Sequence, residues 1–237
     1  MVLSWNDGPL LRTAVASTLD QTGADPRIVV VDNGSDVPPD VPDSSAVTVV
    51  RNATNRGVAP ARNQGVALGT ASAVLILDSD AELVPGCLAA LLDALDADPS
   101  VAMAAPVYVD QPPEASAGRA PGVLRKLARG LGLTSDYARV RRAPGATQWD
   151  VDFAIGACQL VRRDAWDAVG GLDDSYFYGP EDLDLCLRLR RAGHRIVQVA
   201  GAQCRHPARR RHRSLFASGG ARHARALVRH YVREWRR

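Results

Sequence analysis

Acidic side chains follow two apolar segments in the first half of this chain. Asp32 comes directly after residues 27–31, and Asp78 and Asp80 follow residues 73–77. If both segments are strands of an open α/β sheet, these carboxylates lie at the strand ends where such sheets bind ligands, and alternation places Asp78 and Asp80 on one side. Two such carboxylates suit Mg²⁺ or Mn²⁺, which also bind substrate phosphates. An Asp-x-Asp pair is equally a common polar turn, so alone it leaves both interpretations open.

A second acidic pair, Glu181 and Asp182, lies in the first turn of a helix predicted over residues 180–191. The helix begins with acids and ends at Arg190 and Arg191, which is the charge polarity that helices prefer. Taken alone, the pair is best explained by this helix end, where each acid contributes less than about 1 kcal/mol.

Strand and helix patterns alternate through residues 1–106. The apolar runs expected to form strands lie at 2–4, 27–31, 46–50, 73–77 and 101–106, and the helical patterns lie at 9–22, 60–68 and 85–95. Proline suits the first position of a helix, which is why the second helix is expected to begin at Pro60. Strands that are apolar throughout and separated by helices predict an α/β fold, with a mainly parallel central sheet that is covered on both faces.

The periodicity weakens in the second half. Residues 110–149 are rich in glycine and proline and include a basic segment at 124–131, which predicts a variable, partly mobile region. Ordered structure is expected again at 151–161, and a strand at 195–199. A final helix is predicted from about residue 214, with one apolar stripe among arginines.

Composition places the chain among ordinary globular proteins, with 46% hydrophobic and 23% charged residues over 237 positions. The four cysteines are far apart and lack metal-ligand spacing, so we expect reduced thiols in a cytoplasmic protein: Cys87, Cys158, Cys186 and Cys204. No signal peptide and no apolar run of membrane-spanning length is recognised, which argues against secretion by that route and against an integral membrane protein.

The charge is distributed unevenly along the chain. Residues 205–237 carry eleven arginines against one acid, whereas the preceding residues carry 18 basic and 25 acidic side chains. This extension is expected to meet something anionic or to pack as an ordinary helix on the body. Tyr231 and Trp235 among the arginines fit an anionic membrane surface, and hence a peripheral position at the inner face of the cell membrane. A nucleic-acid partner is the weakest interpretation, because no aromatic-interleaved motif accompanies the charge.

Five sequence blocks, in a fixed order, carry a resemblance to a known family. The blocks are Val-Val-Asp-Asn-Gly-Ser-Asp (30–36), Asn-Arg-Gly-x-Ala-x-Ala-Arg-Asn-x-Gly (55–65), Leu-Ile-Leu-Asp-Ser-Asp-Ala-Glu-Leu (75–83), Gly-Ala-Cys-Gln-Leu-Val-Arg-Arg-Asp-Ala-Trp-Asp-Ala-Val-Gly-Gly-Leu-Asp (156–173) and Tyr-Gly-Pro-Glu-Asp-Leu-Asp-Leu-Cys-Leu-Arg-Leu-Arg-Arg-Ala-Gly (178–193). From about residue 2 to 206 the chain strongly resembles glycosyltransferase family 2. The subgroup that looks most similar contains rhamnosyltransferases and related enzymes of bacterial cell-wall and surface polysaccharide assembly.

The resemblance implies inverting sugar transfer on a Rossmann-like glycosyltransferase-A fold. It divides the chain into a glycosyltransferase domain at 1–206 and a basic extension at 207–237. Within the domain, 1–106 would bind the nucleotide-sugar donor, and 107–206 would bind the acceptor and carry catalysis. The implied donor is dTDP-rhamnose or a UDP-sugar, the cofactor is Mg²⁺ or Mn²⁺, and the acceptor is a glycan or a lipid-linked sugar. A catalytically weak member that binds a glycan or a protein is the alternative. A nucleotidyltransferase is disfavoured, since no Gly-rich phosphate loop follows the first strand.

Family positions also assign the nucleotide-sugar contacts. Asp32 matches the acid that contacts the base, and Ser4 and Asn6 match the first loop that lines the nucleotide. Arg62 matches an arginine near the nucleotide, with an exposed helix arginine as the other interpretation. Asn63 is expected to hold its loop together.

The metal and catalytic positions follow in the same way. Asp80 is the implied metal ligand, and Asp78 is implied to contact the metal, a metal-bound water or the ribose. His206 is implied to complete the metal site if a neighbour holds its other ring nitrogen, although Pro207 begins a segment unlike the Gly/Ser-rich loop that often follows in the family. Asp182 is implied to be the general base, with Glu181 supporting it or binding the acceptor.

Overall fold

The computed structural model describes residues 1–120, 140 and 142–207. The predicted basic segment at 124–131 and the predicted final helix from residue 214 lie outside these residues. The same holds for nearly all of the basic extension.

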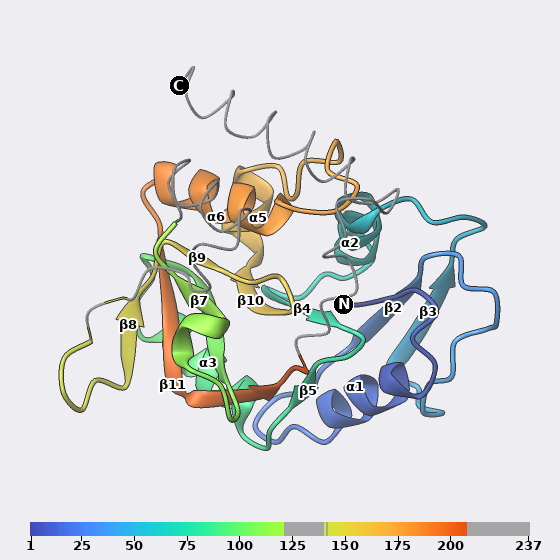
Figure 1. Ribbon diagram of the computed structural model, residues 1–237, viewed down its shortest axis with the longest axis horizontal. Helices are drawn as coiled ribbons and strands as arrows, with labels where there is room; N and C mark the ends of the chain where they lie inside the picture. The colour runs from blue at the N-terminus through green and yellow to red at the C-terminus, as the bar shows by residue number, and fades with distance from the viewer. Residues whose placement is uncertain (121–139, 141, 208–237) are drawn as a thin grey trace, which may run out of the picture.

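One nine-stranded sheet forms the centre of the described chain (Figure 1). Its path is β3-β2-β1-β4-β10-β6-β11-β5, and β8 pairs with β11 beside this path. The strands of this sheet are β1 (Val2–Ser4), β2 (Ile28–Asp32), β3 (Val47–Arg51), β4 (Ala73–Asp78), β5 (Glu82–Leu83), β6 (Val101–Tyr108), β8 (Gln148–Asp150), β10 (Cys158–Arg162) and β11 (Arg195–Arg205). A separate two-stranded sheet joins β7 (Ala117–Gly118) to β9 (Phe153–Ala154).

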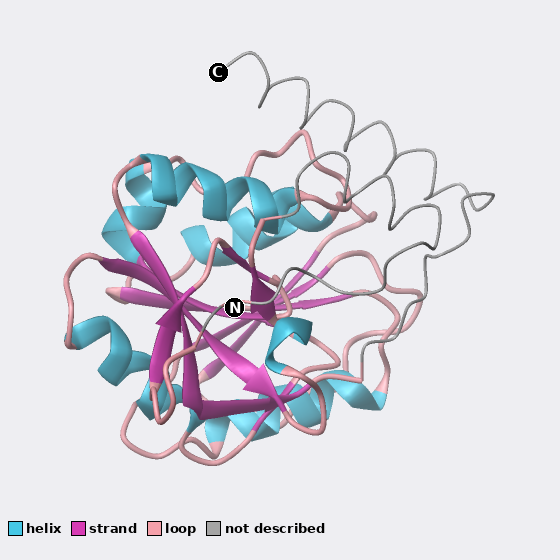
Figure 2. Cartoon of the chain, turned by 60° about the vertical axis from the view of Figure 1, so that its left-hand side comes forward, coloured by secondary structure: helices cyan, strands magenta, loops and turns pink. Residues whose placement is uncertain are grey.

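Helices lie on both faces of the large sheet, as Figures 1 and 2 show. They are α1 (Pro9–Leu19), α2 (Val58–Ala67), α3 (Cys87–Asp96), the short 3-10 helix η1 (Pro113–Ala115), α5 (Arg163–Ala168) and α6 (Glu181–Arg191). One core packs α1 and α3 against the sheet, and a second core packs α2, α5 and α6 against it. Leu77 of β4 belongs to the first core, whereas Val74 and Ile76 belong to the second. Residues 73–77 of this strand are all apolar because both of its faces pack against a core.

Strand direction changes in the middle of the sheet. The strands β3, β2, β1 and β4 are parallel, as the sequence predicts for residues 1–106. Beyond β4 the sheet is mixed, since β10 runs antiparallel to both β4 and β6, and β5 and β8 run antiparallel to β11. The chain enters β10 from the edge at which β6 ends, so β10 must run opposite to its neighbours. An apolar run carries no information on direction, which is why the sequence did not predict this.

Two predicted boundaries shift in ways that matter for the site. Helix α2 begins at Val58 rather than at Pro60. It follows Gly57, which has a φ of 93° and where a Cβ would lie 2.8 Å from Phe177. Strand β11 continues to Arg205, well beyond the predicted end at residue 199, because its register shifts between Val199 and Gln203 and pairing then resumes.

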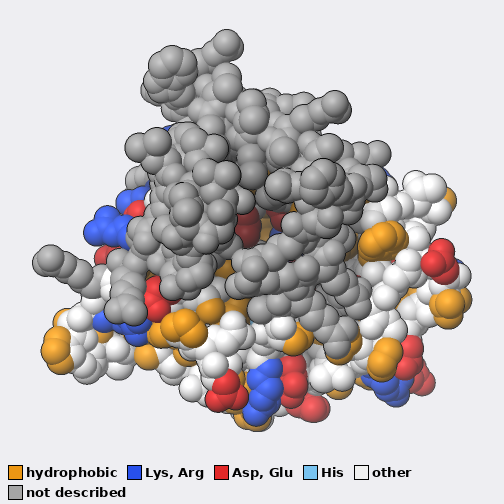
Figure 3. Space-filling model, in the orientation of Figure 1, with side chains coloured by type: hydrophobic (Ala, Val, Ile, Leu, Met, Phe, Trp, Pro, Cys, Tyr) orange, Lys and Arg blue, Asp and Glu red, His pale blue; other side chains and the backbone are white. Residues whose placement is uncertain are grey.

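The described surface carries exposed charges of both signs. Figure 3 shows acidic and basic side chains next to one another along the lower edge of the face in view. The exposed ion pairs Arg12–Asp40 and Arg205–Glu82 are of this kind. None of the described helices combines the length and apolar character that crossing a membrane requires. All four cysteines are buried and free of disulfide bonds.

Candidate active site

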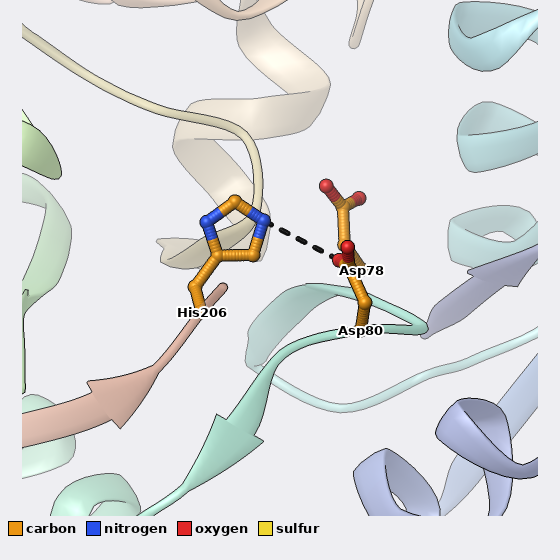
Figure 4. A group of neighbouring side chains, drawn as sticks. All are labelled: Asp78, Asp80 and His206. Atoms are coloured by element: carbon orange, nitrogen blue, oxygen red, sulfur yellow. Dashed lines mark ion pairs between the residues drawn. The ribbon is translucent and has the colours of Figure 1, made fainter. Parts of the chain in front are cut away.

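Asp78, Asp80 and His206 form a compact group at one edge of the sheet (Figure 4). One ligand atom from each side chain lies within 4.8 Å of the others, and His206 Nε2 is 3.3 Å from Asp80 Oδ1. The pairing of β5 with the end of β11 brings His206 to this place, since Arg205 lies opposite Glu82. The sequence separates these residues widely, and only the extended β11 brings them together.

The convergence of Asp78 and Asp80 has a different cause from the predicted one. Strand β4 ends at Asp78, so alternation along a strand does not place Asp80. A turn does so instead, in which the Ala81 amide donates to the Asp78 carbonyl at 3.1 Å. The predicted proximity is present, and the turn supplies it.

This group fits a divalent cation by its chemistry. Two carboxylates and one imidazole are ligands that such ions accept, and they leave room for phosphate oxygens. Burial raises the pKa of Asp78, while Arg62 and His206 oppose that change. Burial acts to lower the pKa of His206, but Asp80 outweighs it and the pKa is raised. In the metal-free site His206 and Asp80 are therefore in direct contact, and a divalent ion would replace that contact.

The second ring nitrogen of His206 lacks the hydrogen-bond partner on which its predicted metal role depends. Nδ1 has no hydrogen-bond partner within the part of the chain that the structure describes. The imidazole instead packs against the Tyr108 ring, with centroids 5.2 Å apart. Gln111 Nε2 donates to the His206 carbonyl at 2.9 Å. Packing and a backbone contact thus orient the ring in place of a hydrogen bond to Nδ1.

Arg62 is buried between the metal-ligand group and the acid pair. Its Nη2 donates to Asp78 Oδ1 at 2.6 Å and to the Gly156 carbonyl at 3.0 Å. Its Nη1 donates to Glu181 Oε1 at 3.3 Å. Only 4% of Arg62 is exposed. Burial works to lower its pKa, but Asp78 and Glu181 outweigh that effect and the pKa is raised. The guanidinium is thus a fixed positive charge that joins two sets of carboxylates.

Glu181 and Asp182 begin α6 and face different partners. Glu181 contacts Arg62 through Oε1, and its Oε2 has no hydrogen-bond partner among the described residues. Asp182 Oδ2 accepts from the Gly156 amide at 3.1 Å, and its Oδ1 accepts from the Leu183 amide at 2.7 Å. Burial and, to a smaller extent, the neighbouring Asp182 raise the pKa of Glu181 to about 7 against the opposing charge of Arg62. The two acids therefore differ in their hydrogen-bond partners, since Asp182 accepts from two backbone amides and Glu181 contacts a guanidinium.

The predicted nucleotide residues gather at the ends of β1 and β2. Ser4 and Asp32 lie opposite each other in the register of these strands. The Asn6 amide donates to Ser35 Oγ at 2.8 Å, which joins the loop after β1 to the loop after β2. Asp32 is completely buried, and its Oδ1 accepts from the Ser35 amide at 3.1 Å. Ser4, Asn6 and Asp32 thus lie together at the carboxyl ends of β1 and β2 and in the loop after β1.

The structure excludes one of the two interpretations of Arg62, and its proximity to the nucleotide stays a prediction. The prediction placed it near the nucleotide or on an exposed helix face. Its nearly complete burial excludes the exposed alternative. Among the described residues its hydrogen-bond partners are the carboxylates of Asp78 and Glu181 and the Gly156 carbonyl. Asn63 does hold its neighbouring loop, since it exchanges two hydrogen bonds with the backbone of Leu172.

Two residues of this region were not predicted. Asp7 Oδ2 accepts from the Trp5 amide at 2.9 Å and also contacts Ser79 Oγ, so it joins the first loop to the turn that carries Asp80. Arg51 Nε donates to Asp32 Oδ2 at 2.8 Å from the end of the adjacent strand β3. Their positions could have indicated them, since both lie at or just after a predicted strand end.

The family of the chain follows from comparison with known proteins. The model of the family described as Glycosyl transferase family 2 matches residues 1–170. The chain belongs to this family. It is similar to the N-acetylglucosaminyl-diphospho-decaprenol L-rhamnosyltransferase of Mycobacterium tuberculosis, at 30% identity over 232 residues, which cover 87% of this chain and 74% of the relative. The resemblance inferred from the five blocks is confirmed.

Two solved structures show the fold. The crystal structure of GalNAc-T7 with UDP, GalNAc and Mn²⁺ matches with a TM-score of 0.69 and 16% identity, over 86% of this chain and 42% of that one. The mannosyltransferase PcManGT from Pyrobaculum calidifontis, in complex with GDP-Man and Mn²⁺, matches with a TM-score of 0.64 and 21% identity, over 100% of this chain and 63% of that one. These likenesses confirm the predicted glycosyltransferase-A fold of family 2 members. The chain thus spans less than two thirds of the length of either structure.

Proposed function

We propose that this chain transfers a sugar, with inversion, from a nucleoside-diphosphate sugar to an acceptor hydroxyl. One observation carries the proposal: a single guanidinium contacts Asp78 of the metal-ligand group at 2.6 Å and Glu181 of the acid pair at 3.3 Å. A diphosphate bound near Asp78 and an acceptor bound near the acid pair would therefore adjoin. This is the arrangement that direct displacement at the anomeric carbon needs.

The donor is proposed to bind at the carboxyl ends of the strands in the N-terminal half. Ser4, Asn6 and Asp32 would hold the nucleoside, and Asp78, Asp80 and His206 would hold Mg²⁺ or Mn²⁺. A bound divalent ion would neutralise the charge of the departing diphosphate as a Lewis acid. The two carboxylates and the imidazole within 4.8 Å of one another support this assignment.

The acid pair, Glu181 and Asp182, is proposed to remove the proton of the acceptor hydroxyl. As the acceptor oxygen bonds to the anomeric carbon and the bond to the diphosphate breaks, the acceptor hydroxyl must lose its proton. Asp182 is the proposed base, because the Gly156 amide fixes its Oδ2 and each carboxylate oxygen keeps further lone pairs. Glu181 is proposed to bind or orient the acceptor, since its Oε2 has no hydrogen-bond partner among the described residues.

The proposed donor is dTDP-rhamnose, with UDP-sugars as the alternative, and the proposed acceptor is a lipid-linked sugar or a glycan of the cell wall or cell surface. The support is the similarity to an L-rhamnosyltransferase whose name includes a diphospho-decaprenol-linked N-acetylglucosamine. The eleven arginines of residues 205–237 are proposed to bind an anionic membrane surface where such an acceptor is anchored.

Thermal unfolding with nucleotides tests the proposal first. UDP or dTDP should raise the melting temperature, and Mn²⁺ should enlarge this shift, because ligands stabilise the state that they bind. Transfer from dTDP-rhamnose and from a set of UDP-sugars to polyprenyl-diphosphate-linked N-acetylglucosamine then tests the reaction. A melting temperature that no nucleotide changes, with or without Mn²⁺, would refute donor binding and with it the proposed function.

A further inference from the structure

We propose that Arg62 and the peptide of Gly156 form a bridge that fixes the acid pair relative to the metal-ligand carboxylates. Arg62 is then a positioning residue, not a ligand of the nucleotide. This inference rests on the proposed function, because it assigns the bridge to the same reaction. It also gives Gly156, the first residue of the block at 156–173, a role in the site that was not predicted from the sequence.

The bridge has two arms. In the direct arm, Arg62 Nη2 contacts Asp78 Oδ1 at 2.6 Å, and Arg62 Nη1 contacts Glu181 Oε1 at 3.3 Å. In the second arm, Arg62 Nη2 donates to the Gly156 carbonyl at 3.0 Å, and the Gly156 amide donates to Asp182 Oδ2 at 3.1 Å. One guanidinium thus reaches both acids at the start of α6, one of them through a peptide group.

The glycine at position 156 is explained by this guanidinium. A Cβ there would lie 2.6 Å from Arg62 Nη1 and 3.3 Å from Arg62 Cζ. Gly156 is not among the glycines with positive φ, so the backbone alone would accept alanine. A side chain at this position would therefore displace the guanidinium. Since Arg62 is buried and held by its partners, that displacement must break contacts of the bridge.

Charge explains why an arginine is needed here. Asp78, Glu181 and Asp182 are three carboxylates around one buried point, and like charges this close repel each other. A planar guanidinium has five donors and can serve several acceptors in fixed directions. Lysine keeps the charge, but its single ammonium cannot reach Asp78, Glu181 and the Gly156 carbonyl in the same geometry.

Gly156→Ala is the decisive variant, and Gly201→Ala is its matched control. A Cβ at Gly201 would meet nothing within 4 Å, and its φ is not positive. Gly156→Ala should lower kcat for sugar release from dTDP-rhamnose on the order of 10²-fold, because a displacement of about 1 Å in an active site costs about that much. Isothermal titration should also show weaker binding of UDP in the presence of Mn²⁺, since Asp78 loses its partner. Gly201→Ala should match the wild type in both.

A double-variant experiment in metal-free protein tests the bridge without any activity. Arg62→Lys should lower the urea midpoint of unfolding in the wild-type background and leave it unchanged in the Gly156→Ala background, because the contacts are already broken there. Equal shifts in both backgrounds would overturn the bridge. The bridge would also be overturned if Gly156→Ala had the same kcat and the same Mn²⁺-dependent UDP affinity as Gly201→Ala.

The two proposals fail in different ways. If Gly156→Ala does not fold, the same double-variant experiment is run with Arg62→Lys and Glu181→Gln. The bridge is overturned if the shifts that these two variants cause in the urea midpoint are simply additive. A wild type that binds no nucleotide and releases no sugar refutes the proposed function, while the unfolding cycle still decides whether Arg62 links these residues.

Discussion

Glu181 is tied to Arg62 through one carboxylate oxygen only, with Oε1 at 3.3 Å from Nη1 and Oε2 without a hydrogen-bond partner among the described residues. Asp182, the next residue, has both oxygens on backbone amides. The two neighbouring acids therefore have different electrostatic surroundings. Paired carboxyl groups in different environments are the arrangement in which acid and base roles separate.

Glu181 should make the metal-free protein less stable as the pH rises. Its pKa is raised from 4.5 to about 7, chiefly by burial and then by Asp182. Between these values the native state binds the proton more tightly than the unfolded chain does, so the free energy of unfolding falls with increasing pH. The difference is on the order of 1 kcal/mol for each unit between the two pKa values. Urea unfolding at about pH 5 and about pH 7.5 measures it.

Glu181→Gln should remove this part of the pH dependence, because glutamine has no proton to lose. Glu114→Gln changes a glutamate outside the site and should keep the wild-type dependence. If Glu181→Gln and the wild type lose stability in parallel as the pH rises, the carboxyl group is already ionised at the lower pH.

Chelation should abolish sugar transfer, and Mn²⁺ or Mg²⁺ should restore it. Asp80→Ala should weaken UDP binding as well as turnover, because the ion would link the protein to the diphosphate. Asp93→Ala, which changes an exposed acid of α3, is the control and should behave as the wild type. The measurements are titration of UDP with and without Mn²⁺, and transfer rates in excess EDTA. Full activity in excess EDTA would contradict metal dependence.

A chain that ends at residue 212 should still bind nucleotide but lose affinity for anionic vesicles. This truncation removes seven of the eleven arginines and the one acid after residue 204, so the charge excess falls from +10 to +4. Vesicle binding of the full chain should weaken as salt is added, because screening acts on exposed charge. Co-sedimentation with vesicles of anionic and of neutral lipid gives the comparison. Equal binding to both would contradict an electrostatic role for the basic extension.

Much of the fold could be predicted because its signals are local. Apolar runs and helical patterns identified β1, β2, β3, β4 and β6 and the helices between them to within a few residues. The direction of β10 could not be predicted, since it depends on the end of the sheet from which the chain enters this strand. The length of β11 was also missed, because its register shift after Val199 interrupts the pattern.

The site could be predicted as a set of residues but not as a network. Asp78 and Asp80 could be predicted as metal ligands because they follow a strand. The roles of Asp182 and His206 were predicted from the resemblance to the family. The partners of Arg62 could not be foreseen, because Gly156 and Glu181 reach it from segments 94 and 119 residues away. Long-range contacts of this kind depend on the tertiary arrangement that brings Arg62 of α2 to the start of α6 and to the loop before β10.

Asp182→Asn should reduce turnover on the order of 10²–10⁴-fold, the usual contribution of a general base. Asparagine keeps the size of the side chain and can still accept from the Gly156 amide, but it cannot take up a proton. Donor affinity should stay nearly unchanged, because Asp182 is proposed to meet the acceptor and not the diphosphate. Glu181→Gln should cost less.

The comparison with Asp80→Ala separates the roles, since only that variant should lose donor binding together with turnover. Steady-state kinetics and UDP titration on the three variants are the measurements. If both acids merely favour the start of α6, each substitution changes stability slightly and leaves the rate unaltered. Near-wild-type turnover in Asp182→Asn together with an inactive Glu181→Gln would instead assign the base to Glu181, whose raised pKa of about 7 already suits proton transfer near neutral pH.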